Sequence, residues 1–518
     1  MTSRAAIADR YAFPALLLVL TLLFCSGIVS IRLDPPFGLA TYSRALYADE
    51  GFYVDAARNL VQFGRWSLPY DFDHWPGAPM LNVILAAVFG LFGASLESAR
   101  ISSMIFSFAS CLIFYNLCRT VFDRLPSAAL TLAAASTLNF IAFARSTLAD
   151  PTATFFSLSA LLIYVRFTNR LWAIPASLTL ALVAHLTKSY FITALIAIVV
   201  LWIFELAIRL HHYKWQFRRT DIVIFGASLF LLTGMYLCYL WHFWVPISYW
   251  THVTVGPKAG DFNAFEIIWN YLRQLRSLPF YTKTHIFIAS SIICTLIIVM
   301  TAELRAKLRG IINRTDLAII VWLTLGLALV GSLDQQRPRY LFFAILLLCY
   351  IGARVAQIVA PGRHKNTVIV ALAIAHIAIQ APFYYFWLTR DQNTAQYDMG
   401  VRMANLIDQR DNARLVPVIG EMAAFVALFS SRIHSLDAKW VAPDYSLCDR
   451  IGRWRPRFHV NLVWPGSETH HELAMVTACE PVTGATEIER IVTFRPWHDE
   501  AVLSELHYGV NEPDEPSR

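Results

Sequence analysis

Two adjacent carboxylates, Asp49 and Glu50, occur shortly after the first long apolar stretch of the chain. This position predicts that they lie at a membrane surface, where a carboxylate is partly removed from water. Partial loss of hydration raises the proton affinity of a carboxylate, which suits it to accept a proton from a hydroxyl group. The pair therefore indicates a general base, with Asp49 as the candidate. A solvated stretch of loop is the alternative interpretation.

A third carboxylate, Asp150, lies in the short segment Ala144–Pro151 between two apolar stretches. Pro151 fits the first turn of the helix that follows, because its missing N–H group needs no partner there. Asp150 then falls at the N-cap, where helix capping alone would explain it. We expect Asp150 to cap this helix, to act with Asp49, or to do both.

Cationic groups at the ends of other apolar stretches could hold an anion. Lys188 lies between two such stretches, and Arg337, Arg339 and Tyr340 lie just before a third. Arginine binds two phosphate oxygens at once, and lysine supplies a compact positive charge. The alternatives are that Lys188 extends its ammonium group to the membrane surface and that the two arginines anchor the chain to lipid headgroups.

Two histidines are further candidates. His252 lies in a polar segment rich in aromatic residues and could contact a metal or a phosphate. His74 precedes the proline-rich turn Trp75–Pro79 and could line a site with Asp73, although a structural turn also explains this segment. The sequence contains no Cys-x-x-Cys motif and no Cys/His cluster with zinc spacing.

The composition places these residues in a membrane protein. The chain has 518 residues, of which 57% are hydrophobic and 15% are charged, and a mean hydropathy of +0.49. Soluble proteins have roughly 25% charged residues, so a single soluble domain, a disordered chain and a disulfide-stapled secreted module are excluded.

Charge divides the chain into two parts. Residues 390–518 hold 13 basic and 19 acidic residues, a balance of −6, whereas the preceding residues hold 30 and 17, a balance of +13. We therefore expect a membrane domain, residues 1–389, and a polar domain, residues 390–518. The net charge of +7 indicates membrane orientation rather than nucleic-acid binding, because no soluble stretch carries a basic stripe with interleaved aromatic residues.

Eleven apolar stretches are candidates for membrane spans, which need about 20 apolar residues. A twelfth, Pro79–Leu96, is short and contains two glycines. The eleven are Phe13–Ile31, Ile101–Val121, Ala128–Phe143, Thr152–Phe167, Leu171–Leu186, Phe191–Ile208, Ile222–Val245, His285–Met300, Leu317–Leu333, Leu341–Ile358 and Val368–Trp387.

Loop charge predicts the orientation of these spans. Six short segments, the N-terminus included, hold 17 Lys and Arg residues, and they share one side only if Pro79–Leu96 does not cross the membrane. Since basic loops are typically cytoplasmic, we interpret Pro79–Leu96 as a juxtamembrane or half-inserted helix of a long first outer loop, residues 32–100. The chain is then a multi-pass protein of the cell (inner) membrane with a cytoplasmic N-terminus and an extracytoplasmic, periplasmic C-terminal domain. Phe13–Ile31 is interpreted as a retained span rather than a cleaved signal peptide.

The polar domain alternates short helix-like and strand-like patterns. Val401–Arg410 is typical of a helix, and five short runs are typical of strands, so we expect a small α/β domain. Its two cysteines, Cys448 and Cys479, could form a disulfide in an oxidising compartment or stay free. The predicted strands are Leu415–Ile419, Arg432–Ser435, Phe458–Val463, Ala474–Ala478 and Arg490–Phe494.

The ordered set of motifs resembles the GT-C fold glycosyltransferases, the group that includes the protein O-mannosyltransferases and the lipid A aminoarabinose transferase. Some positions depart from the pattern of that group. Ser189 replaces a glycine after the lysine, Phe52 stands where some relatives have an arginine, although Arg58 is close, and His74-Trp75 replaces the pair found before the proline. The matching segments, within about residues 10–360, are Asp49-Glu50, Trp75–Pro79, Phe92-Gly93 before Arg100, Ala144-Arg145, Asp150-Pro151, Thr187-Lys188 and Arg337-Pro338-Arg339-Tyr340.

The resemblance implies a polytopic α-helical GT-C domain of about 11 transmembrane helices. Its activity would be transfer of a hexosyl or pentosyl group from a polyprenyl-phosphate donor to a hydroxyl group of a lipid, glycan or protein on the outer face of the membrane. No glycine-rich phosphate loop supports a nucleotide-sugar donor.

The resemblance also implies roles for single residues. Asp49 would be the general base. Glu50 and Asp150 would orient the acceptor or Asp49, or would help to hold a divalent metal ion, for which His252 and His74 are further candidate ligands. The residues that would bind the donor phosphate are Lys188, Arg337, Arg339, Tyr340 and Arg58.

Two functions without transfer chemistry compete with this interpretation. A transporter or flippase of a lipid-linked sugar predicts essential ionisable groups in the middle of spans, whereas the groups singled out above lie at predicted outer ends. An outward-facing binding protein would use the spans as an anchor, and eleven spans exceed what an anchor needs.

Overall fold

The computed structural model describes residues 3–33, 46–67, 75–212, 219–243, 313–331, 342–359, 364–389, 394–420, 422–436, 446–463, 471–480, 482–494 and 499–508. The side chain of Asp49 lies outside this description, although its backbone lies inside it. The other residues of interest that lie outside the described residues are His74, His252, Arg337, Arg339 and Tyr340.

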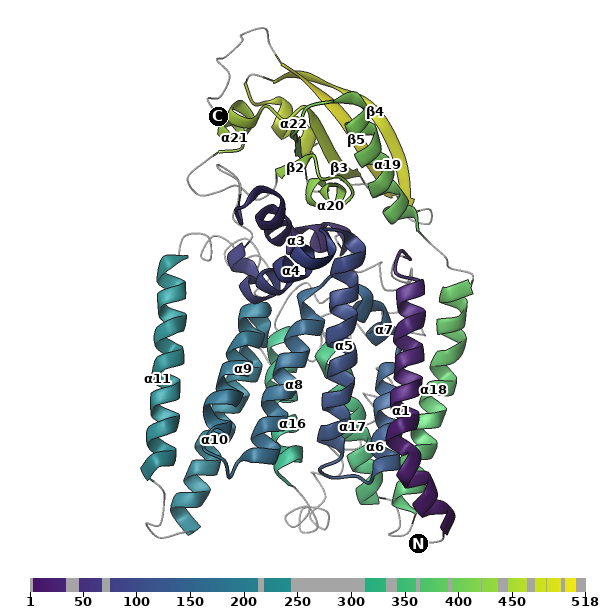
Figure 1. The fold of residues 1–518 in the computed structure, drawn as a ribbon, viewed down its shortest axis with the longest axis vertical. Helices are drawn as coiled ribbons and strands as arrows, with labels where there is room; N and C mark the ends of the chain where they lie inside the picture. Colours follow the sequence, from purple (N-terminus) through teal and green to yellow (C-terminus); the bar gives the residue numbers. More distant parts are fainter. Residues whose placement is uncertain are drawn as a thin grey trace.

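Long apolar helices run back and forth along one bundle, and a mixed helix and sheet region caps one end of it (Figure 1). Five described helices are each long and apolar enough to cross a membrane, and the bent pair α6 and α7 makes a sixth if it is one span. The predicted helical membrane protein is confirmed, whereas the total of eleven spans stays a prediction. The bundle helices are α1 (Ser3–Val29), α5 (Leu96–Cys118), α6 (Arg124–Ala135), α7 (Leu138–Arg145), α8 (Ala149–Phe167), α9 (Ala173–Thr187), α10 (Ile192–His212), α11 (Arg219–His242), α16 (Arg314–Gly331), α17 (Phe342–Val359) and α18 (Lys365–Thr389).

The predicted span Ala128–Phe143 is not one continuous helix. It breaks after Ala135, and α7 departs from the direction of α6 by 66°. The first N–H groups of a helix lack intrahelical acceptors, and the N–H of Leu138 donates instead to Oε1 of Gln380 on α18, at 3.2 Å. The hydroxyl of Thr137 lies 3.1 Å from Nε2 of His376 on the same helix. Contacts with α18 therefore support the break.

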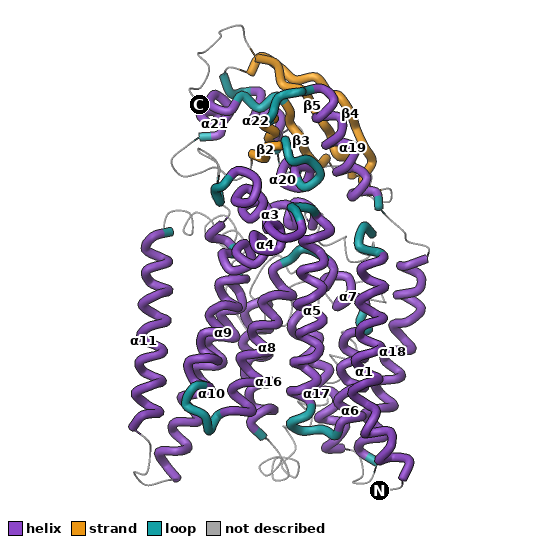
Figure 2. Tube along the Cα trace, in the orientation of Figure 1, coloured by secondary structure: helices purple, strands orange, loops and turns teal. Residues whose placement is uncertain are grey.

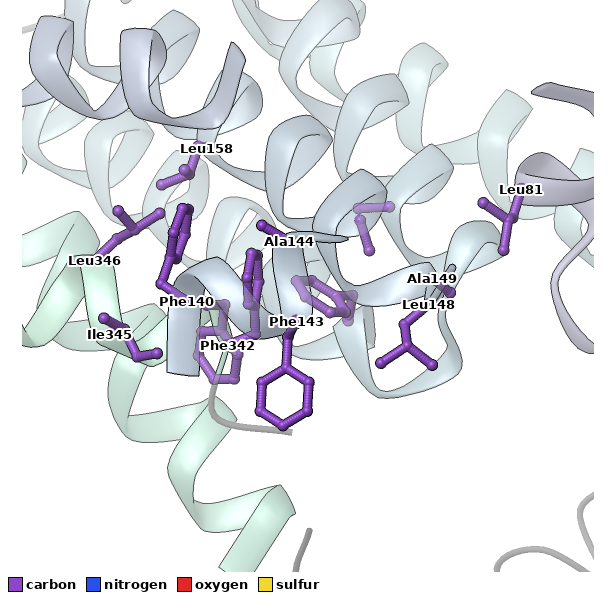
Figure 3. Packing of buried hydrophobic residues seen from close by; sticks show 14 of the residues in the cluster. Leu81, Phe140, Phe143, Ala144, Leu148, Ala149, Leu158, Phe342, Ile345 and Leu346 are labelled. Atoms are coloured by element: carbon purple, nitrogen blue, oxygen red, sulfur yellow. The ribbon is translucent and has the colours of Figure 1, made fainter. Parts of the chain in front are cut away.

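Buried apolar side chains pack around α7 and the turn that follows it (Figure 3). The ring of Phe140 stacks on that of Phe342 from α17, with centroids 4.6 Å apart and planes 11° apart. Leu148 and Leu158 are fully buried. Dense packing of this kind resists movement, so the buried side chains around α7 hold the start of α8 in place.

The first outer loop of the sequence prediction is largely helical. It contains α3 (Leu46–Phe63), the short 3-10 helix η1 (Trp75–Gly77) and α4 (Pro79–Phe92). Both α3 and α4 lie at the end of the bundle, between the bundle and the sheet (Figure 2). The interpretation of Pro79–Leu96 as a juxtamembrane or half-inserted helix stays a prediction. Asp49 and Glu50 lie in α3 and not in an irregular loop.

Residues 394–508, which we call the C-terminal domain, contain a five-stranded sheet in the order β2-β1-β3-β5-β4. A separate domain over residues 390–518 stays a prediction. Strands β2, β1 and β3 pair in parallel, and β3, β5 and β4 pair in antiparallel fashion. The elements are α19 (Ala395–Arg410), β1 (Val416–Ile419), α20 (Ala423–Ala427), β2 (Ile433–Leu436), α21 (Leu447–Trp454), β3 (Phe458–Val463), α22 (His471–Thr477), β4 (Val482–Phe494) and β5 (Asp499–Tyr508).

The structure differs from the strand prediction for this domain at two places, and it settles the state of the two cysteines. Ala474–Ala478, expected as a strand, lies mostly in α22, and β5 was not predicted at all. Cys448 and Cys479 form a disulfide. It joins the start of α21 to the end of α22, so the local context of the cysteine pair is helical rather than extended.

His434 on β2 lies where the C-terminal domain meets α3. Its ring is 3% exposed and packs against Phe63 and Trp454, with centroids 4.8 and 4.7 Å away. Burial, together with the positive charges of Arg58 and Arg65, lowers the pKa of His434 to about 3.

This shift predicts a pH-dependent stability. Between pH 6.5 and 3 an unfolded His434 binds a proton that the folded one does not, so the free energy of unfolding should fall as pH falls through this range, by up to about 1.4 kcal/mol per pH unit. Thermal unfolding in detergent at pH 7.5, 6 and 5 measures it. The His434→Phe variant should show a smaller decline, and an equal decline in both proteins would contradict the assignment to His434.

Candidate active site

Glu50 is fully buried and fixes the start of α3 to the membrane domain. Nε and Nη2 of Arg100 donate to its two carboxylate oxygens at 3.0 and 2.8 Å. The backbone N–H of Thr147 donates to Oε1 at 2.7 Å. Both oxygens are therefore engaged. This suits Glu50 to holding α3 in place more than to accepting a proton.

Arg100 and Arg145 also hold the end of α1. Nη1 of Arg100 donates to the carbonyl of Ile31 at 2.7 Å, and Nη2 of Arg145 donates to the carbonyl of Leu33 at 2.7 Å. Nη1 of Arg145 donates to the carbonyl of Ser30. These carbonyls follow the last residue of α1, Val29, so the two buried arginines fix the turn after the helix. Arg145 of the predicted second outer loop is thus engaged with the backbone that follows α1.

Asp150 lies in the first turn of α8, whose N-cap is Leu148. The expectation that Asp150 caps this helix is therefore wrong. The side chain is fully buried, and its Oδ1 accepts a hydrogen bond from the hydroxyl of Tyr190. Its Oδ2 has no hydrogen-bond partner among the described residues. A buried carboxylate oxygen without a donor is costly, so Oδ2 is able to accept a hydrogen bond from a further group.

Lys188 lies directly after α9 and is 7% exposed, so it does not extend to the membrane surface. Its ammonium group donates to the hydroxyl of Tyr53 on α3 and lies 4.3 Å from the centroid of that ring. The ring of Tyr190 lies 6.0 Å from the same ammonium. Tyr53, Asp150, Lys188 and Tyr190 therefore form one buried group, which we call the Lys188 cluster.

The Lys188 cluster joins α3 to α8 and α9, and Asp49 lies one helical turn before Tyr53 on α3. Residues four apart on a helix share a face, so the backbone places Asp49 on the side of α3 that carries Tyr53. Tyr53 and Tyr190 were not predicted from the sequence as site residues. The spacing of Tyr53 from Asp49 and the closeness of Tyr190 to Lys188 in the sequence are the signals that could have indicated them.

Arg58 is not part of this cluster. It is fully buried against the C-terminal domain, where its Nη2 donates to the carbonyl of Ser430 at 3.0 Å and to that of Ile433. Burial lowers the pKa of Arg58 to about 10, and the nearby Asp55 carboxylate opposes this shift. Its partners in the structure are backbone carbonyls, which differs from the donor phosphate expected from the sequence.

The described residues do not fit a metal centre. Among them, no three His, Cys, Asp or Glu side chains come together as metal ligands would. Glu50, one expected ligand, has both oxygens occupied by Arg100 and Thr147. We therefore derive no step through a metal ion.

Comparison with known proteins identifies the fold. Residues 76–239 match the family model of the dolichyl-phosphate-mannose-protein mannosyltransferases, and this segment contains Arg100, Asp150 and Lys188. Among curated proteins, no sequence matches. The structure is similar to that of ArnT from Cupriavidus metallidurans bound to undecaprenyl phosphate, with a TM-score of 0.52 and 14% identity over 95% of this chain and 97% of that one. The same protein in the apo state matches with a TM-score of 0.53 and 13% identity over 95% and 98% of the two chains.

A further similar structure is the archaeal oligosaccharyltransferase AglB from Archaeoglobus fulgidus in complex with an inhibitory peptide and a dolichol-phosphate. It matches with a TM-score of 0.49 and 12% identity over 88% of this chain and 70% of that one. The likeness to ArnT, over nearly the full length of both chains, shows the fold. This chain is a polytopic membrane protein with the GT-C fold, as the order of its motifs predicted.

Proposed function

We propose that this chain is an integral membrane glycosyltransferase that moves a sugar from a polyprenyl-phosphate donor to a hydroxyl group of a lipid, glycan or protein acceptor. The observation that carries the proposal is the Lys188 cluster, in which a buried ammonium and a buried carboxylate with an unpartnered oxygen lie beside the helix that carries Asp49. The ArnT structure with undecaprenyl phosphate has the same fold, which supports a lipid-linked phosphate as the leaving group.

In the proposed reaction, the acceptor hydroxyl oxygen attacks the anomeric carbon of the donor sugar and gives its proton to Asp49. The bond between the anomeric carbon and the phosphate oxygen breaks, and the polyprenyl phosphate leaves with the bonding electrons. A fixed positive charge stabilises a leaving group as its negative charge develops. Lys188 would supply that charge from inside the Lys188 cluster, and the remaining candidates for the same phosphate are Arg337, Arg339 and Tyr340.

Asp150 and Glu50 would have separate roles in this reaction. The unpartnered Oδ2 of Asp150 is able to accept a hydrogen bond from the acceptor, while the hydroxyl of Tyr190 holds the other oxygen. Glu50 would act through Arg100 and Thr147 and keep the start of α3 in place. We therefore treat Asp150 as a substrate contact and Glu50 as a positioning residue.

We also propose the predicted orientation, with a cytoplasmic N-terminus and an extracytoplasmic C-terminal domain. The start of α1 lies at the end of the bundle remote from the C-terminal domain (Figure 1). The basic turns between α5 and α6 and between α8 and α9 follow helices that run away from the C-terminal domain, which supports a common side for these turns. The Lys188 cluster would then face a compartment without nucleotide sugars.

A transporter or flippase of a lipid-linked sugar is the alternative function. Such a protein is expected to hold its essential ionisable groups in the middle of spans. Asp150 lies in the first turn of α8, and Lys188 lies directly after the last residue of α9. This placement at helix ends favours transfer at the membrane boundary.

The proposal is tested by incubating the purified chain in detergent with a panel of polyprenyl phosphates that carry different labelled sugars. We expect one donor to be consumed, with release of polyprenyl phosphate and either transfer of the sugar or its slow hydrolysis. Nucleotide sugars carrying the same sugars serve as controls and should not react. A chain that turns over no lipid-linked donor, or that prefers a nucleotide sugar, contradicts the proposal.

Lys188→Met provides a prediction for the leaving-group site. Removal of one charged group that stabilises a developing anion typically lowers turnover about 10²–10³-fold, and we expect a loss of this size here. Lys365→Met, which changes an exposed lysine at the start of α18, is the matched control and should keep wild-type turnover. Donor consumption by the two variants is compared. Equal rates would show that Lys188 does not stabilise the leaving phosphate.

A further inference from the structure

Two faces of α3 contact two different parts of the molecule. Glu50 and Tyr53, three residues apart, contact the membrane domain through Arg100 and Lys188. Gly51, Asp55 and Arg58, spaced by four and three residues, contact the C-terminal domain. Such spacings place residues on one side of a helix. The stretch 50–58 of α3 thus contacts the membrane domain on one side and the C-terminal domain on the other.

The contact at Gly51 leaves no room for a side chain. A Cβ atom at this position would lie 2.8 Å from Cα of Phe425, in the backbone of α20. Real Cβ atoms essentially never lie so close to a backbone atom. The glycine therefore lets α3 and α20 approach to backbone contact, which fixes the distance between the two helices.

Polar groups set the rotation of α3 against the same domain. The hydroxyl of Ser435 on β2 donates to Oδ1 of Asp55 at 2.5 Å, and Nδ2 of Asn59 donates to Oδ2 at 3.0 Å. One turn further on, Nη2 of Arg58 donates to the carbonyl of Ser430 at 3.0 Å. Asp55 is 3% exposed, and Arg58 is fully buried.

These contacts are specific because of their burial. Nη2 of Arg58 and both oxygens of Asp55 have partners, whereas Nε and Nη1 of Arg58 have none among the described residues. Buried charged groups are least costly where such partners are available, so the partnered atoms favour one arrangement of the surfaces that carry them. Rotation of α3 by one residue, about 100°, would withdraw Asp55 and Arg58 from the C-terminal domain and Glu50 from Arg100. The two faces thus hold the same helix in a single orientation.

We propose that the C-terminal domain is a positioning element of the active site. By holding the face of α3 formed by Gly51, Asp55 and Arg58, it fixes the helix rotation and therefore the place of Asp49 relative to the Lys188 cluster. This inference rests on the proposed function of Asp49. The hydroxyl of Ser435 is the positioning group, and it acts through Asp55 without touching the substrate.

The test uses Ser435→Ala, Ser435→Thr and a matched control, Ser504→Ala, in the full-length chain. Ser435 and Ser504 both lie in strands of the C-terminal domain and are 3% and 1% exposed. A misplacement of about 1 Å in a reacting group costs up to about 10²-fold in rate. For Ser435→Ala we expect kcat to fall about 10-fold or more, with KM for the lipid-linked donor and binding of undecaprenyl phosphate unchanged. Ser435→Thr, which keeps the hydroxyl, should restore kcat, and Ser504→Ala should match the wild type.

The outcomes separate this inference from the proposed function. If the wild-type chain shows no transfer activity, the proposed function itself is wrong. A wild-type chain that transfers sugar, together with a Ser435→Ala variant of equal kcat, overturns only the positioning role. A parallel fall of kcat and Tm in Ser435→Ala that Ser435→Thr does not restore also overturns it, because it would show a merely structural effect. Gly51→Ala is a second variant and should lower kcat further than Ser435→Ala.

Discussion

Asp49→Asn should lower sugar transfer by about 10²–10⁴-fold, the usual contribution of a general base. Asparagine has nearly the same size as aspartate but cannot accept the proton of the acceptor hydroxyl. The backbone of Asp49 lies in α3, one turn before Tyr53 of the Lys188 cluster. The substitution should therefore leave membrane insertion, thermal unfolding and binding of undecaprenyl phosphate as in the wild type. Transfer is measured with the donor that the wild-type chain consumes.

The control for this experiment is Asp398→Asn. Asp398 also lies in the first turn of a helix, α19, but in the C-terminal domain. This variant should keep full activity, so a general effect of removing one carboxylate is accounted for. Normal activity of Asp49→Asn would disprove the assignment of Asp49 as the base, whatever the fate of the control.

Glu50→Gln is expected to have the largest effect on stability. The change leaves Arg100, 2% exposed, without the carboxylate that pairs with it at 2.8 Å. Removal of one partner of a buried ion pair costs about 3–5 kcal/mol, because the remaining charge stays buried without compensation. The glutamine oxygen can still accept from the N–H of Thr147, but its NH2 group would face the donor Nη2 of Arg100. Unfolding in detergent by heat or denaturant should therefore show a marked loss of stability.

A double-mutant cycle isolates the pair itself. Glu50→Leu alone and Arg100→Met alone should each destabilise the chain, because each leaves the other member of the pair buried without its partner. The combined Glu50→Leu and Arg100→Met variant should lose clearly less than the sum of the two single changes, since apolar residues of similar volume often replace a buried pair at small cost. If the losses of stability in the two single variants add up to that of the double variant, Glu50 and Arg100 do not stabilise each other.

Local sequence patterns predicted the described bundle helices, apart from one helix break, while the predicted span His285–Met300 lies outside the described residues. Apolar length predicted the bundle helices because each satisfies its backbone groups within itself. The break between α6 and α7 contains neither proline nor glycine at its centre, Ser136-Thr137. It depends on Gln380 of α18, which is 242 positions from Leu138 in the sequence. A local pattern does not reveal a support that comes from so far along the chain.

In the C-terminal domain, too, local sequence patterns predicted some elements and missed others. β1, β2 and β3 were predicted because buried alternating runs are typical of strands. The run Ala474–Ala478 is as apolar as a strand, yet it forms the end of α22, next to the disulfide of Cys479. Tertiary contacts and the covalent link outweigh the local preference of so short a run.

For the candidate active site, the sequence indicated residue types but not the contacts between them. Asp150 and Lys188 were chosen because they are ionisable groups at the ends of apolar stretches, and the structure brings them together through Tyr190. The contact between Lys188 and Tyr53 spans 135 positions. That between Arg58 and Ser430 spans 372, so Arg58 could not be assigned to the C-terminal domain from its neighbours in the sequence.

The fate of the donor sugar in sealed vesicles tests the central claim most directly. The purified chain is reconstituted with its labelled polyprenyl-phosphate sugar and an acceptor carrying a free hydroxyl group. We predict that label appears covalently on the acceptor and that free polyprenyl phosphate is released in equal amount, and that Asp49→Asn lowers both by about 10²–10⁴-fold. Movement of the intact labelled lipid to the opposite leaflet, without release of polyprenyl phosphate, would show a flippase and contradict the proposed transferase.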